Sequence, residues 1–70
     1  MSDLFDALET SRKAQGLMAG IREHIAIGKA LEQVGRDTVS REYVRAAIKL
    51  IEQGHRELTE TAKILKQLIS

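Results

Sequence analysis

Residues 35–40 read GRDTVS, which is the one turn-like segment in this chain of 70 residues. Gly35 is predicted to end a helix, because glycine readily adopts the left-handed conformation that closes many helices. Ser40 is predicted to be the N-cap of the helix that follows. The chain contains no proline that would break either helix. We therefore predict one domain over residues 1–70, with helices at about 3–35 and 40–69 and a turn at 36–39.

Apolar residues recur at helical spacing on both sides of this turn. In the first helix, which Ser2 or Asp3 is predicted to cap, they are Leu4, Leu8, Ala14, Leu17, Met18, Ile21, Ile25, Leu31 and Val34. In the second helix a strict 4-3 repeat consists of Val44, Ile48, Ile51, His55, Leu58, Ala62, Leu65 and Ile69. A short turn between two long helices predicts an all-α fold, an antiparallel helical hairpin of the coiled-coil type.

Each predicted helix carries a further apolar stripe beside the first. These additional residues are Leu17, His24, Ile27, Leu31 and Val34 in the first helix and Tyr43, Ala47, Leu50, Ile64 and Leu68 in the second. A helix with one neighbour needs only a narrow apolar seam, whereas a broad apolar face indicates two neighbours. Chains of this size also rarely form a sufficient core alone. We therefore expect the hairpin to form a homodimeric four-helix bundle or to receive helices from another protein.

The composition limits the classes of function. Lys and Arg total 11 against 10 Asp and Glu, and a formal net charge of +1 gives no bulk field to attract nucleic acid or an anionic membrane. There is no cysteine, so a disulfide framework and a thiol nucleophile are excluded. The sequence has no phosphate loop, dinucleotide fingerprint or nucleophile elbow. We expect a protein that is not an enzyme and has no cofactor.

The N-terminal residues are polar and acidic, and the apolar runs are too short to cross a bilayer. A cytoplasmic protein without a membrane partner is the expectation.

Glu52 and His55 have the Glu-x-x-His spacing that carboxylate-bridged metal sites use in helical bundles. Counting from the predicted turn places His24 level with Ile51, about one helical turn from His55. His24, Glu52 and His55 are therefore candidate metal ligands. The alternative is that His55 is a polar residue in an apolar packing seam, where such a residue often sets register and oligomeric state. We favour the packing interpretation.

Basic residues follow an outer ridge of the second helix, namely Arg41, Arg45, Lys49 and Arg56. Some dimeric helical hairpins bind RNA or DNA through such ridges. Most of the basic residues, however, have an acidic neighbour three or four residues away, as in an ordinary solvated helix face. No aromatic residues are interleaved to stack on bases. Nucleic-acid binding is therefore the alternative function.

The primary prediction is a protein–protein interaction module, either a self-associating hairpin or a small adaptor or chaperone-like subunit that packs a partner helix. In size and layout the chain is similar to the small helical-hairpin co-chaperones and adaptors of bacterial secretion systems, and to small dimeric regulators of plasmid RNA. The residues expected to form the interaction surface are Leu17, Ile21, His24 and Ile25 in the first helix and Ile48, Ile51, His55, Leu58 and Leu65 in the second.

Overall fold

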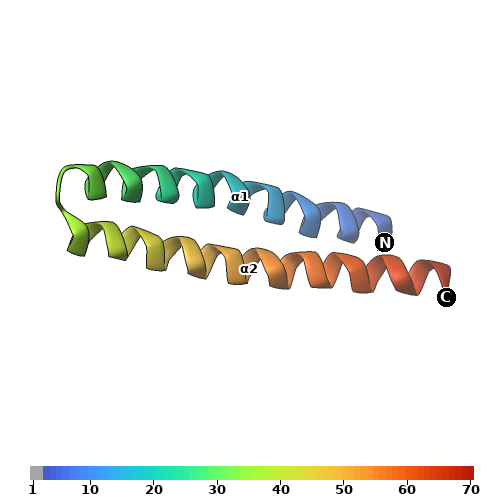
Figure 1. Ribbon diagram of the computed structural model, residues 1–70. Helices are drawn as coiled ribbons and strands as arrows, with labels where there is room; N and C mark the ends of the chain where they lie inside the picture. Colours follow the sequence, from blue (N-terminus) through green and yellow to red (C-terminus); the bar gives the residue numbers. More distant parts are fainter. Residues whose placement is uncertain (1–2) are drawn as a thin grey trace.

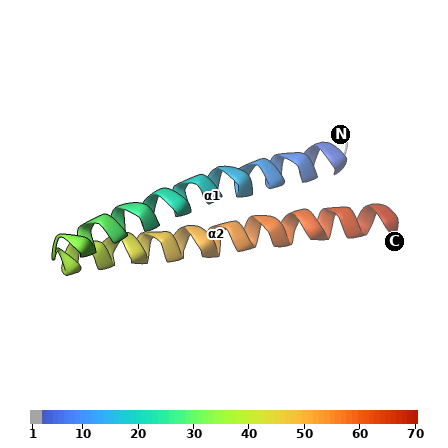
Figure 2. The ribbon, with the colours of Figure 1, turned by 45° about the horizontal axis from the view of Figure 1, so that its top comes forward.

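The computed structural model describes residues 3–70, which form two helices, α1 (Asp3–Gln33) and α2 (Asp37–Ile69). Figure 1 shows them side by side and antiparallel, with the turn at one end of a rod and both chain termini at the other. When the rod is turned by 45°, the ribbons overlap near the turn and separate toward the termini, so the helices are inclined to each other (Figure 2). The predicted all-helical hairpin is confirmed. The predicted cap at Ser2 lies outside the described residues.

The turn closes around Gly35, which has a left-handed φ of +79°. The Gly35 amide donates to the Glu32 carbonyl at 3.0 Å, and the Arg36 amide donates to the Leu31 carbonyl at 2.9 Å. This pair of bonds is the Schellman motif, which satisfies carbonyls that have no partner within the helix. The predicted helix end at Gly35 is confirmed, and only residues 34–36 separate α1 from α2.

The second helix begins three residues earlier than predicted, at Asp37 rather than Ser40. The carboxylate of Asp37 lies in the first turn of α2, where the helix dipole favours an anion. Ser40 is inside the helix, so its prediction as the N-cap is wrong. Its hydroxyl is buried and donates to the Gly28 carbonyl of α1 at 2.7 Å. The polar group that predicts a cap thus joins the two helices instead.

Small residues build the contact between α1 and α2, which we call the interhelical seam. The buried residues among positions 3–70 are Ala7, Ala14, Gly28, Ser40, Ala47 and Gly54. Within each helix they are spaced by seven residues or a multiple of seven, which is the coiled-coil period. Because their side chains are short, the helices approach closely. Among the described residues, no large side chain is fully buried.

Contacts across the seam define the register of the helices. A Cβ atom placed on Gly20 would lie 3.4 Å from Cδ1 of Leu50, and one on Gly54 would lie 4.0 Å from Cδ1 of Leu17. His24, four residues beyond Gly20, is therefore level with residues 46–47 of α2 and not with Ile51. The predicted register is wrong because the turn lies earlier in the chain than expected, at residues 34–36 rather than 36–39.

Candidate interaction surface

The strict 4-3 repeat of α2 lies beside the seam and is exposed. Ile48, Ile51 and Leu58 are 48%, 50% and 55% exposed. Of the further stripe of α2, Ala47 is buried and Tyr43, Leu50 and Ile64 are half-buried, whereas Leu68 is 42% exposed. A sustained 4-3 repeat is the pattern with which one helix packs against another. The hairpin therefore leaves one complete helix-packing stripe of α2 uncovered.

Helix α1 adds exposed apolar residues to the same side of the hairpin. Leu4, Met18 and Ile25 fall in one seven-residue series, which runs as a line beside the seam. At the end that carries the termini, Leu4 lines a shallow hollow together with Leu65 of α2. Near the turn, Cγ2 of Val44 lies 3.7 Å from the Cβ position of Gly28, against α1. The exposed residues of the two helices thus form one surface.

We call this surface the outer apolar face. It consists of Leu4, Leu8, Met18 and Ile25 in α1 and Val44, Ile48, Ile51, Leu58 and Leu65 in α2. These nine residues are each between 42% and 63% exposed.

Most of the predicted interaction residues lie on or within this face. Those that are exposed there are Ile25, Ile48, Ile51, His55, Leu58 and Leu65. Leu17, Ile21 and His24 are half-buried and serve the seam instead. The outer apolar face also includes Leu4, Leu8, Met18 and Val44, which were not among the predicted interaction residues. The seven-residue series through Leu4, Met18 and Ile25 is the signal that would have found the α1 part.

The structure separates the two histidines. His24 is half-buried, its Nδ1 donates to the Gly20 carbonyl at 2.7 Å, and its ring centroid lies 5.7 Å from that of Tyr43. His55 is exposed and lies eight or nine residues beyond the level of His24, about 12 Å along the axis. Within residues 3–70, no three His, Asp or Glu side chains lie close enough to hold a metal ion. His24, Glu52 and His55 therefore do not form a metal site within one hairpin.

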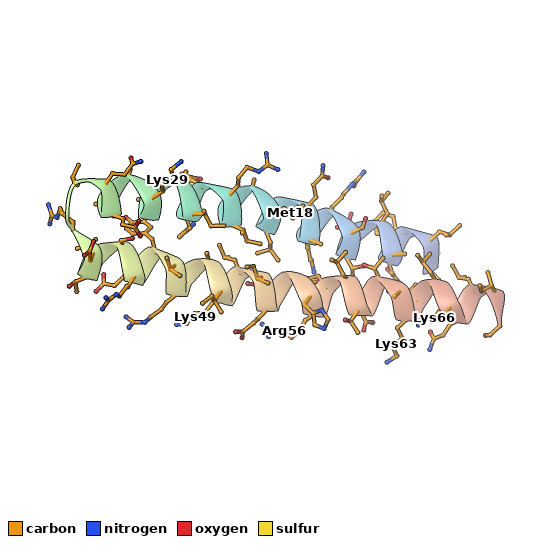
Figure 3. All side chains as sticks on the ribbon, viewed as in Figure 1. Met18, Lys29, Lys49, Arg56, Lys63 and Lys66 are labelled. Carbon is orange, nitrogen blue, oxygen red and sulfur yellow. The ribbon has the colours of Figure 1, made fainter. Side chains whose placement is uncertain are left out.

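The basic residues lie outside the seam. In Figure 3, Lys49, Arg56 and Lys63 point from α2 away from α1. Arg41 and Arg45 are exposed as well. The single ion pair found within the described part of the chain lies in α1, so none of these five side chains is held by an acidic partner.

Comparisons with models of protein families, with curated proteins and with solved structures find no match for this chain. Neither α1 nor α2 is long and apolar enough to cross a membrane. Among the described residues, the outer apolar face is therefore the main candidate functional site.

Proposed function

We propose that the chain is a non-enzymatic protein–protein interaction module whose outer apolar face packs against a second copy to form a four-helix bundle. The observation that carries this proposal is the extent of the face. Its nine side chains are about half exposed. At roughly 90 Å² each they present about 800 Å², which is what one partner contributes to a standard protein–protein interface. The largest apolar patch of a typical monomer is about 300–600 Å².

The small core of the hairpin supports the same proposal. The buried apolar side chains are those of Ala7, Ala14 and Ala47, which remove little surface from water. Ordering the backbone costs about 1–2 kcal/mol for each residue, and a seam of small residues offsets little of that cost. Covering the outer apolar face would add the burial that the hairpin lacks.

A second copy is the occupant that matches the face in length. The face extends along both helices of a rod that measures 53 × 14 × 14 Å between Cα atoms. Another hairpin presents a surface of equal length and the same stripe, and two such surfaces meet around a two-fold axis. A helix pair from another protein is the competing occupant.

Sedimentation equilibrium of the full chain over a hundredfold range of concentration tests the proposal, with a dimer as the expected result. A monomer with weak helicity would contradict it and would show that the second helix pair comes from another protein.

Leu58→Glu is expected to convert the dimer to a monomer, because the substitution places an unpaired charge in the centre of the buried face. Gln53→Glu is the matched control, since Gln53 is exposed and lies outside the outer apolar face. Sedimentation of the two variants should give a monomer and a dimer respectively. A dimer in both would exclude this face as the interface.

Nucleic-acid binding is the second candidate function. The observation in its favour is that Lys49, Arg56 and Lys63 recur every seven residues and point away from α1 without acidic partners (Figure 3). Lys49→Glu with Arg56→Glu should abolish binding to duplex DNA or RNA in an electrophoretic shift assay at about 50 mM salt, where phosphate contacts are strong. Sedimentation should show an unchanged dimer. Absence of any shift with the unsubstituted chain would exclude this function.

A further inference from the structure

A pair of polar residues lies halfway along the length of the outer apolar face. His55 comes four residues after Ile51 and three before Leu58, so it belongs to the α2 part of the face. Gln15 comes seven residues after Leu8 and three before Met18, so it belongs to the α1 part. Both side chains are exposed in the hairpin.

The register places Gln15 and His55 level with each other. Leu17 lies beside Gly54 across the seam. Because the helices are antiparallel, the level of Gln15, two residues before Leu17, falls one or two residues after Gly54, which is the position of His55.

The pair also lies at the midpoint of the face. Leu4 precedes Gln15 by eleven residues and Ile25 follows it by ten. The same intervals separate His55 from Val44 and Leu65, the two ends of the α2 part.

The other polar positions of this face need no partner from a second chain. The Ser11 hydroxyl donates to the Leu8 carbonyl of its own helix at 2.8 Å. Arg22 is exposed and has a long side chain that can carry its charge past a neighbouring helix into water. Gln15 and His55 form no side-chain hydrogen bond in the hairpin, and their shorter side chains would be enclosed in a bundle.

We propose that Gln15 and His55 of both copies meet in one polar layer at the centre of the dimer and that this layer sets its register. The inference rests on the proposed dimer. An amide has two donors and two acceptor lone pairs, and a neutral imidazole has one donor and one acceptor, so the four groups satisfy one another. Because the pair lies at the midpoint, the four groups share one level along the dimer whether the two turns are at the same end or at opposite ends.

A displaced register would separate these groups. A shift of seven residues moves the imidazole and the amide of each copy away from those of the other, toward positions such as Leu8, Ile48 and Ala62, and leaves them without the hydrogen-bond partners of the layer. Such unsatisfied groups are costly, whereas the apolar contacts change little in a seven-residue repeat. The polar layer thus distinguishes one register from others that the apolar residues tolerate.

Introduced cysteines test the layer, because the natural chain has none. Full-length Gln15→Cys and His55→Cys variants are oxidised separately and as a mixture, after sedimentation has established that each is a dimer. A disulfide is expected in at least one of the three pairings, namely 15 with 15, 55 with 55, or 15 with 55. His55→Cys mixed with Ile48→Cys or Ala62→Cys, each seven residues away, should give no disulfide between position 55 and position 48 or 62.

The possible outcomes separate the two proposals. A monomeric unsubstituted chain contradicts the proposed dimer itself. A dimer that forms none of the three central disulfides, or in which the cysteine introduced at position 55 joins position 48 or 62, overturns the polar layer and leaves the dimer in place.

His55→Leu tests whether His55 sets the register of the dimer. If His55 only filled space, its replacement would not change which positions of the two copies form disulfides. Replacing the histidine with an apolar residue should tighten the dimer Kd about tenfold, as removal of a polar residue from a helix-packing stripe does. When His55→Leu chains that also carry Gln15→Cys are mixed with His55→Leu chains that carry Ile48→Cys or Ala62→Cys, disulfides between position 15 and position 48 or 62 should appear beside those of the central level. Gln53→Leu, outside the face, should change neither quantity. An unchanged Kd together with an unchanged disulfide pattern in His55→Leu would overturn the proposal.

Discussion

Two glycines, Gly35 and Gly16, play opposite parts in the stability of the hairpin. Gly35 has a φ of +79° in the turn, a conformation that costs other residues about 1–2 kcal/mol. Gly35→Ala should therefore lower the free energy of unfolding by about 1 kcal/mol. Urea unfolding at one fixed protein concentration measures the change.

Gly16→Ala is the matched control for that measurement. Gly16 lies inside α1 with nothing within 4 Å of its Cβ position. Alanine should raise the free energy of unfolding by about 1 kcal/mol, because it is the better helix former. A destabilised or monomeric Gly16→Ala variant would show that another chain approaches this position closely.

At the scale of the helices, the sequence predicted both stripes of α2 but not which one faces α1. Both follow the same coiled-coil period, so periodicity cannot rank them. Small residues decide the outcome: Ala47 and Gly54 let the backbones approach, whereas Ile51 and Leu58 would hold them apart. The turn at residues 34–36 also sets a register that a count from the predicted turn at 36–39 does not reproduce. Ser40 was misassigned because its hydroxyl suits a helix cap and a buried interhelical bond equally well.

Close packing of the helices depends on the short side chains of the seam. Ala47 is 3% exposed, so Ala47→Leu should force α1 and α2 apart and cost about 1–3 kcal/mol of unfolding free energy through overpacking. Ala26→Leu is the control, because Ala26 is exposed and lies away from the seam. Urea unfolding compares the two variants, and equal stability would contradict the proposed sensitivity of the seam.

At the scale of the whole molecule, folding and association should be one process. The residues that the seam fully buries are all small, so in the proposed dimer the second hairpin would supply apolar burial that one hairpin lacks. The Tm followed by circular dichroism should rise with protein concentration over a hundredfold range, as mass action requires of a dimer that unfolds to separate chains. A Tm independent of concentration, in a fully helical chain, would mean that one hairpin is stable alone.

The two ends of the rod differ, because one carries the turn and the other carries both ends of the chain. Both termini lie at the end opposite the turn (Figure 1). A protein fused near residue 3 or residue 69 therefore lies at the same end of the rod, and the turn at residues 34–36 forms the opposite end. In a dimer, two fused proteins would lie close together if both turns are at the same end. They would lie nearly one rod length of 53 Å apart if the turns are at opposite ends. Energy transfer between fluorophores attached near residue 69 of each copy would distinguish the two dimers. The first would hold two attached proteins together at one end, and the second would act as a spacer between them.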